Sequence, residues 1–208
     1  MICELVGPMG VGKTTVTPLV AERLGATSYR GQAYHGLDDE PLSTTELWVD
    51  RIISVARNPR LALAAARAFP GSRRQAVNFA LNTCRRDRLE ARAARSGGGV
   101  IESGPVHAIS QMSAWQHHDM SVLAGYIHKA DVYVRLEATP EEVTRRLDSR
   151  RQLPPEYIDL HDQWIERYDA CVDEMIARLG RPLVVVDAND EPGVVADHIV
   201  SALTPFVE

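Results

Sequence analysis

Residues 7–14 combine glycines, a lysine and a threonine at a spacing that suits the binding of a polyphosphate. They read Gly-Pro-Met-Gly-Val-Gly-Lys-Thr and match the pattern G-x-x-x-x-G-K-[ST]. Glycines let the backbone turn inward, so that successive N–H groups face one anion at the positive end of the following helix. Lys13 supplies a compact charge for the β- and γ-phosphates, and Thr14 a hydroxyl for Mg²⁺. The pattern predicts a cradle for ATP with Mg²⁺, formed by Gly7, Gly10, Val11, Gly12, Lys13, Thr14 and Thr15.

A carboxylate that directly follows an apolar run is the second chemical signal. Glu102 ends the run Val100–Ile101. The reactive crevice of an open parallel sheet lies outside the carboxyl ends of its strands, so Glu102 is expected beside the cradle. There it can hold magnesium or a magnesium-bound water. Thr14 and Glu102 are the predicted metal ligands, and a solvated glutamate in a turn is the alternative.

An acidic segment offers a candidate base for the acceptor. Asp38, Asp39 and Glu40 follow a weak second strand. A phosphotransferase benefits from an acid that orients the acceptor hydroxyl and takes its proton. We therefore expect Glu40 or a neighbouring aspartate to be the base and Asp39 to face the acceptor. An exposed acidic turn is the alternative.

Arginines gather in two later segments. A lid is predicted at about residues 143–155, where Arg146 and Arg150 share one helix face and like charges repel until the segment closes on a polyphosphate. A solvated basic helix is the alternative. The long helix from Ser72 to about residue 95 carries arginines at helical spacing that mostly face water. Of these, Arg85 could reach the acceptor.

The elements that position these residues alternate between strands and helices. Strands are predicted at residues 1–6, 26–34, 100–102, 131–136 and 183–186. Helices are predicted at 13–24, 43–57, 61–69, 72–95, 111–128, from Pro140 onward, at 156–179 and at 192–203. This alternation predicts an α/β fold with a parallel sheet and helices on both faces. We find no internal repeat or linker, so residues 1–208 are predicted to form one domain.

Composition excludes several classes of function. The chain has 208 residues and a formal net charge of −5, which does not suit a protein that coats nucleic acid. Its three cysteines form no CxxC pair, as expected for reduced thiols. No apolar stretch approaches the roughly 20 residues needed to cross a bilayer. We expect a cytoplasmic enzyme that acts on a small molecule, with no nucleic-acid or membrane partner.

The chain resembles the deoxynucleoside kinase and thymidylate kinase superfamily of P-loop kinases. "ELVGPMGVGKTT" is similar to the opening strand and loop of that family, "EPL" to its Glu-Pro motif, "VIES" to its Glu-Arg-Ser motif and "DVYVRLEATPEEVTRRLDSRR" to its fourth strand and lid. The resemblance implies a three-layer fold with a five-stranded sheet in the order 2-3-1-4-5. It also implies catalytic roles for Lys13, Glu40, Glu102, Arg146 and Arg150, with both arginines also on ATP.

The resemblance also implies an acceptor site and a specialised acceptor. Asn78 and Arg85 fall where family members place a base-reading amide and a substrate-contacting arginine, and His107 is expected to line the same pocket. Ser103 stands where the family keeps an arginine. The acceptor is therefore expected to be a nucleoside-like compound or a specialised metabolite. A nucleoside monophosphate kinase and an antibiotic-modifying phosphotransferase are the alternatives, and a homodimer is expected by analogy.

Two rival interpretations come from shorter signals. His128-Lys129-Ala130-Asp131 superficially matches the guanine-reading N-K-x-D of regulatory GTPases, but it precedes a strand instead of following one. His107, His117 and His118 could form a metal cluster, although their spacing is not diagnostic. We favour ordinary polar roles for these histidines and a kinase over a switch.

Overall fold

Five parallel strands form one sheet in the computed structural model, which describes residues 1–30, 43–149 and 158–206. The strands are β1 Ile2–Val6, β2 Ser28–Arg30, β3 Gly99–Glu102, β4 Val132–Glu137 and β5 Leu183–Asp187. Their order in the sheet is β2-β3-β1-β4-β5, and every neighbouring pair is parallel. The predicted order 2-3-1-4-5 is therefore confirmed. It puts β1 in the centre, so the loop after β1 opens at the middle of one sheet edge.

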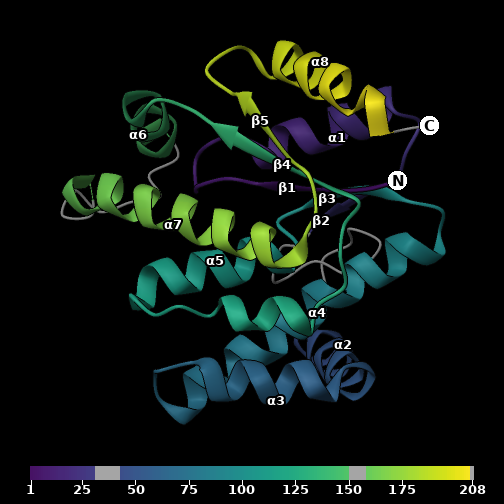
Figure 1. Cartoon of the computed structure of the whole chain (residues 1–208), viewed down its shortest axis with the longest axis vertical. Coiled ribbons are helices and arrows are strands. Elements are labelled where there is room, and N and C mark those ends of the chain that lie inside the picture. The colour runs from purple at the N-terminus through teal and green to yellow at the C-terminus, as the bar shows by residue number, and fades with distance from the viewer. Residues whose placement is uncertain (31–42, 150–157, 207–208) are drawn as a thin grey trace.

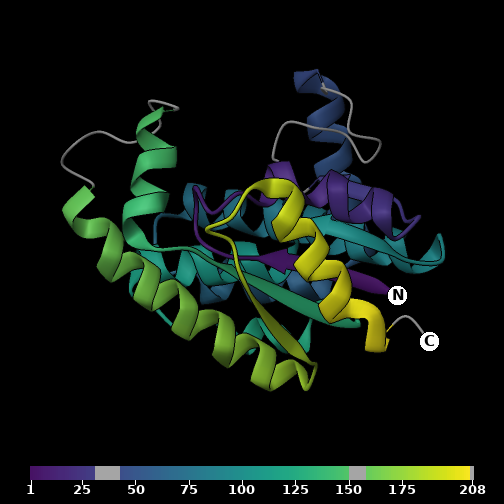
Figure 2. The same ribbon diagram turned by 90° about the horizontal axis from the view of Figure 1, so that it is seen from above.

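Helices cover both faces of this sheet (Figure 1). They are α1 Lys13–Arg23, α2 Thr44–Arg57, α3 Pro59–Ala68, α4 Arg73–Arg95, α5 Pro105–Gln116, α6 Pro140–Ser149, α7 Ile158–Leu179 and α8 Pro192–Leu203, with short 3-10 turns η1 Ser121–Gly125 and η3 Thr204–Phe206. Helices α1 and α8 pack on one face, and α4, α5 and α7 on the other. Figure 2 shows the same layers from above. Helices α2 and α3 lie outside α4.

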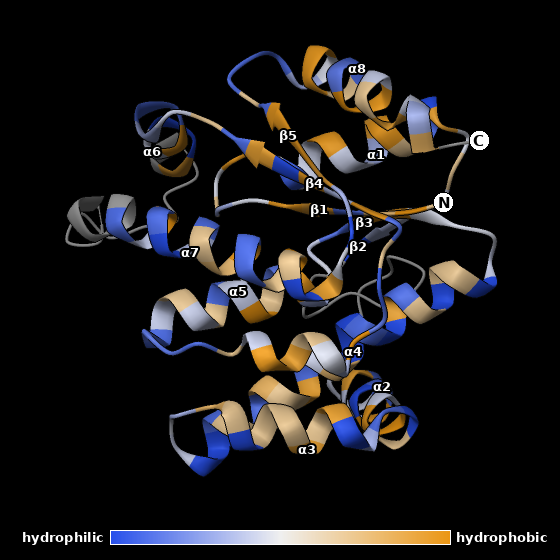
Figure 3. Ribbon diagram, viewed as in Figure 1, coloured by the Kyte–Doolittle hydropathy of each residue, from blue (hydrophilic) through white to orange (hydrophobic). Residues whose placement is uncertain are grey.

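The core has one apolar cluster on each side of the sheet. Cys3 and Leu5 of β1 point toward α1 and α8, whereas Ile2 and Val6 point toward the α4, α5 and α7 side. Both faces of the central strands are covered, which explains their nearly continuous apolar sequence (Figure 3). None of the described helices is long and apolar enough to cross a bilayer.

Caps fix several helix starts where the sequence predicts them. Ser43 and Glu46 form a capping box at α2, and Ser72 caps α4 in the same way. The predicted helix at 111–128 is wrong, because α5 starts earlier and ends at Gln116. Pro105 at the first helical position starts α5, and His117 then takes a left-handed conformation with φ 49°.

Candidate functional site

The loop between β1 and α1 has the backbone of an anion cradle. Gly7, Gly10 and Gly12 have φ values of 148°, 88° and 108°, a region that residues with a Cβ rarely adopt. A Cβ on Gly7 would also lie 2.8 Å from the carbonyl oxygen of Leu136. These two constraints explain why the sequence has glycine at these positions.

Lys13 lies inside this loop. Its Nζ donates hydrogen bonds to the carbonyl oxygens of Gly7 at 2.5 Å and Pro8 at 2.9 Å. Burial lowers the pKa of Lys13 to about 7, although the nearby Glu102 carboxylate opposes the shift. The ammonium is thus held at the loop and is poorly solvated, so an incoming polyphosphate can replace the missing solvation.

Thr14 and Glu102 meet beside the cradle. The Thr14 hydroxyl donates to Glu102 Oε1 at 2.6 Å, and the parallel register pairs Leu5 with Glu102, which brings the ends of β1 and β3 together. Glu102 is buried, and its Oε2 has no hydrogen-bond partner among the described residues. A buried carboxylate with an unpaired oxygen beside a hydroxyl fits a hard cation, so the two predicted metal ligands are suitably placed to bind Mg²⁺.

Arg86, which the sequence reasoning missed, faces the same edge of the sheet. Its Nη1 donates to the carbonyl oxygen of Ser103 at 2.6 Å, and Ser103 has a left-handed φ of 58°. Burial lowers the pKa of Arg86 to about 10, while the Glu4 carboxylate opposes that shift. The guanidinium therefore reaches the backbone of Ser103. This serine stands where the kinase family that the chain resembles keeps an arginine.

Arg85, the predicted acceptor contact, pairs with an acid of α2. It is buried, and its Nε pairs with the Asp50 carboxylate of α2 at 2.7 Å. Arg88 donates to the other oxygen of Asp50 at 2.6 Å. These contacts tie α4 to α2. Asn78, the predicted amide, is exposed on the same helix.

His107 lies under the cradle in the third position of α5. Its backbone N–H donates to Glu4 Oε1 at 2.9 Å, and its ring Nδ1 lies 2.7 Å from the Tyr168 hydroxyl of α7. Burial and the charges of Lys13 and Arg86 hold the pKa of His107 well below its usual value. The ring is therefore neutral, and Nδ1 accepts from Tyr168. Tyr168 could not be recognised from local sequence, because its partners lie on other elements.

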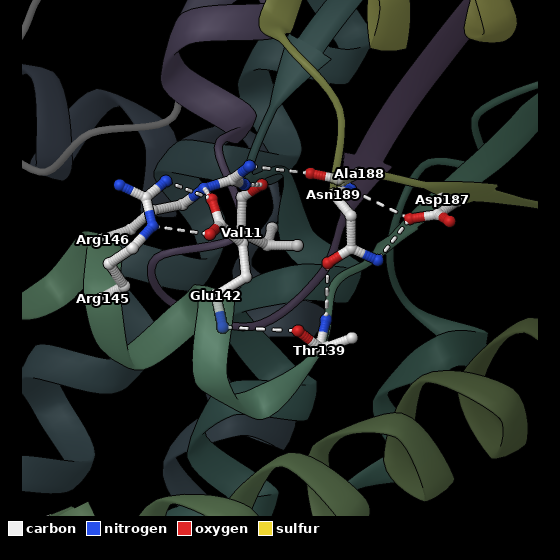
Figure 4. Close-up of polar contacts among 8 residues, drawn as sticks. All are labelled: Val11, Thr139, Glu142, Arg145, Arg146, Asp187, Ala188 and Asn189. Atoms are coloured by element: carbon white, nitrogen blue, oxygen red, sulfur yellow. Dashed lines mark hydrogen bonds and ion pairs between the residues drawn. The ribbon is translucent and has the colours of Figure 1, made fainter.

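Arg146 joins α6 to the cradle. Its guanidinium donates to the carbonyl oxygens of Val11 and Ala188, each at 2.9 Å, and to Glu142 at 2.5 Å (Figure 4). Glu142 also pairs with Arg145, and these two arginines lower the pKa of Glu142 to about 2. The repulsion predicted within the lid is thus offset by an acid in the same helix.

A cavity of about 220 Å³ lies next to Arg146. Its walls come from the cradle, from α6 and from the loop between β5 and α8, and they include Gly12, Thr15, Arg146, Ala188 and Asn189. The side chain of Asn189 braces that loop through the N–H of Thr139 at 2.9 Å (Figure 4). The sequence reasoning missed this loop, because Ala188 contributes a backbone carbonyl and no diagnostic side chain.

Some of the remaining predicted residues lie in the described part of the chain and others lie outside it. Asp38, Asp39, Glu40, Arg150 and Arg151 lie outside the described residues. Asp131 of the rival GTPase motif accepts from the N–H of Ile2 at 2.7 Å, at the sheet edge opposite the cradle. Among the described residues, no three or more histidine, cysteine and acidic side chains are grouped so that they could hold a metal ion, and His117 instead lies beside Arg167. These placements argue against both rival interpretations.

Comparisons with known proteins point to kinases. No family model matches the chain. A shikimate kinase from Streptomyces avermitilis is 29% identical over 199 residues, which cover 96% of this chain and 93% of that protein. A structure of deoxyadenosine kinase from M. mycoides with dCMP and dCDP has a TM-score of 0.61 at 12% identity, and covers 99% of this chain and 100% of that one. The same kinase with dATP has a TM-score of 0.56 at 13% identity, with 98% and 99% covered.

Proposed function

We propose that the chain is a P-loop kinase that transfers the γ-phosphate of ATP to a hydroxyl of a nucleoside-like or specialised-metabolite acceptor. The observation that carries the proposal is the contact between Thr14 and Glu102, 2.6 Å apart beside the buried ammonium of Lys13. A hydroxyl, a carboxylate and a cation at one point suit a magnesium polyphosphate better than any neutral ligand.

The donor nucleotide is proposed to lie across the cradle and the cavity next to it. The phosphates would contact the N–H groups of residues 7–15 and Lys13. The base would enter the cavity beside Arg146 and Ala188, whose contacts join three elements around it. Arg146 and Arg150 are proposed to approach the phosphates from the lid, where cationic groups stabilise the charge of phosphoryl transfer.

Thr14 and Glu102 would hold Mg²⁺, directly or through water. Bound there, the ion would neutralise charge on the β- and γ-phosphates. The chain's own groups do the remaining work. Lys13 binds the phosphate oxygens, and the cradle's N–H groups fix their orientation for in-line attack. Glu40, or Asp38 or Asp39, is proposed to take the proton of the acceptor hydroxyl, and Arg86 to bind charge on the transferred group at the Ser103 end of β3.

A hydroxyl is favoured over a phosphate as the accepting group. The relatives are named for shikimate and deoxyadenosine, compounds that carry hydroxyl groups and no phosphate. Ser103 also follows Glu102 at the position where the kinase family that the chain resembles has an arginine. A nucleoside monophosphate kinase is therefore the second candidate.

The decisive experiment is a screen of nucleosides, nucleoside monophosphates, shikimate-like polyols and hydroxylated antibiotics for acceptor-dependent release of ADP from Mg·ATP. We expect at least one hydroxyl acceptor to stimulate release. Lys13→Ala should lower the turnover of that acceptor roughly 100-fold or more. ADP release that no acceptor stimulates, or a Lys13→Ala variant with normal turnover, would contradict the proposal.

The base and the metal ligand need their own variants. Glu40→Gln should lower kcat by about 10²–10⁴ and leave the Kd for ATP nearly unchanged, as expected for a general base. Glu102→Gln should instead raise the Mg²⁺ concentration needed for half-maximal rate by roughly tenfold or more. If Glu40→Gln has normal kcat, Asp38→Asn and Asp39→Asn decide whether a neighbour is the base.

A further inference from the structure

A second, basic cavity lies between α2 and α4, apart from the cradle. It measures about 250 Å³, and Arg57, Arg88 and Arg95 supply most of the charge in its walls. Cys84, Arg88, Ala91 and Arg95 follow helical spacing on one face of α4, and all four line it. Two of the α4 arginines that were predicted to face water, Arg88 and Arg95, therefore line this cavity.

This cavity extends along α4 toward the end of the sheet opposite the nucleotide site, and it shares no wall residue with the cavity beside the cradle. Helix α4 contacts the carboxyl end of β3 through Arg86 and Ser103, and its last residues reach the other end of β3, where Ala93 accepts from the N–H of Gly98 at 2.8 Å. His128, on the cavity wall, lies shortly before Asp131, which contacts Ile2 at the amino end of β1. A ligand in this cavity would therefore not touch the cradle.

The acids near the cavity are already engaged. Asp87 is buried; it accepts from the Asn58 side chain at 3.0 Å and from the N–H of His128 at 2.6 Å, and the ring of His128 lies 3.0 Å away. Asp50 is shared between Arg85 and Arg88. The side chains of Arg57 and Arg95 are exposed and, within the part of the chain that the structure describes, make neither a hydrogen bond nor an ion pair.

Arg88 adds an unused donor. Its Nε is buried and has no acceptor among the described residues. Burial lowers the pKa of Arg88; the Asp50 carboxylate opposes this shift, and the positive charges of Arg57, Arg92 and Arg95 add to it. Arg57 and Arg95 are exposed, so water screens their repulsion, but Arg88 keeps an unsatisfied buried N–H beside them, and an anion could join all three guanidinium groups.

We propose that this cavity binds a phosphomonoester dianion at a second site, separate from the catalytic one. The site goes beyond the proposed function, because no step of phosphoryl transfer uses it. The cavity walls carry three positive charges, on Arg57, Arg88 and Arg95, and one negative charge, on Asp87, which leaves an excess of about two positive charges. A phosphomonoester carries about −1.5 to −2 at neutral pH and has three acceptor oxygens for guanidinium forks.

The test measures binding of inorganic phosphate and glycerol 2-phosphate by calorimetry. The cradle also binds phosphate, so all proteins carry Lys13→Ala. In this background we expect one site to remain. Adding Arg57→Gln and Arg95→Gln should weaken it at least tenfold. The matched control adds Arg60→Gln and Arg67→Gln, two exposed arginines of α3, and should stay within twofold.

Several results would overturn the second site. These are no binding in the Lys13→Ala background, no loss with Arg57→Gln and Arg95→Gln, or equal losses in both double variants, which would report net charge alone. Acetate that binds as tightly as glycerol 2-phosphate would overturn the assignment to a dianion. ATP binding by the wild type is measured in a separate titration. If the proposed kinase function is wrong, that titration will show it, and the phosphate titrations will not be affected.

Discussion

The hydroxyl of Tyr168 accepts a hydrogen bond from the backbone N–H of Gly7 at 2.9 Å. The two residues are 161 positions apart in the chain, and the same hydroxyl donates to Nδ1 of His107 at 2.7 Å. Helix α7 therefore supports the first glycine of the cradle from below. The chain of hydrogen bonds from Gly7 through Tyr168 to His107 is buried and requires a neutral imidazole, which agrees with the lowered pKa of His107.

Tyr168→Phe should weaken both the fold and the cradle. The substitution leaves the N–H of Gly7 and Nδ1 of His107 buried without partners, at a cost of about 1–3 kcal/mol in the free energy of unfolding. ATP affinity should fall several-fold, because Gly7 is no longer fixed. Urea denaturation and calorimetry measure the two effects. The control is Tyr29→Phe, a buried tyrosine of β2, which should leave ATP affinity unchanged. Unaltered ATP affinity in Tyr168→Phe would mean that the support is only structural.

The lowered pKa of Lys13 makes nucleotide binding depend on pH. Without ligand, Lys13 is mostly neutral above its folded-state pKa of about 7, whereas a bound polyphosphate keeps it charged. Binding at pH 8 should therefore take up nearly one proton, and affinity should fall by up to about tenfold per pH unit above 7. Calorimetry in buffers of different ionisation enthalpy measures the uptake.

The same shift has an opposite consequence for stability. Unfolding returns Lys13 to its ordinary pKa of 10.5, so the unfolded chain binds more protons between about pH 7 and 10.5. This residue's contribution to the free energy of unfolding of the unliganded protein should rise with pH over that window. Lys13→Arg, which stays charged, should abolish both the proton uptake and the rise. Equal proton uptake by Lys13→Arg would place the titrating group elsewhere.

Much of the fold follows from local sequence signals. The capping boxes at Ser43 and Ser72 and the proline at position 140 fix helix starts through contacts within one turn, and apolar runs identify the central strands. The cradle and Glu102 were also predictable, since strand order alone brings the ends of β1 and β3 together. The missed start of α5 had a local signal, because Pro105 after Gly104 suits the first position of a helix.

The acceptor side could not be predicted in the same way. Arg85 and Arg86 are adjacent, and about 100° of helix rotation decides which of them faces the cradle. Their partners, Asp50 and Ser103, are on different elements, so only the packing of α4 shows that Arg85 joins α2 and Arg86 reaches β3. Tyr168 is a similar case, because its role depends on where α7 crosses the loop.

Glu4 and Glu90 form a buried carboxyl pair, and Glu90→Gln should change stability with a specific pH dependence. Burial and the Glu4 charge raise the pKa of Glu90. The folded state thus keeps a proton that the unfolded chain releases above its ordinary pKa of 4.5. As pH rises past that value, this residue destabilises the fold.

An amide at position 90 does not titrate. Glu90→Gln should therefore be more stable than the wild type at pH 8, with a difference of about 1.4 kcal/mol for each unit of pKa shift removed, and should approach it near pH 4. Urea midpoints at several pH values measure the difference. A constant difference from pH 4 to 8 would show that only packing changed.

Arg85 and Arg86 should differ sharply when each is replaced by methionine. Arg85→Met removes a buried ion-pair partner of Asp50 and should lower the free energy of unfolding by roughly 3–5 kcal/mol, toward the low end because Arg88 still pairs with Asp50. Arg86→Met removes a guanidinium beside the cradle and should lower kcat roughly 10²–10³-fold with a smaller loss of stability. Denaturation and steady-state kinetics on both variants provide the comparison. If Arg86→Met keeps its kcat, this guanidinium does not act on the transferred phosphate, and a low kcat for a fully folded Arg85→Met would assign that role to Arg85.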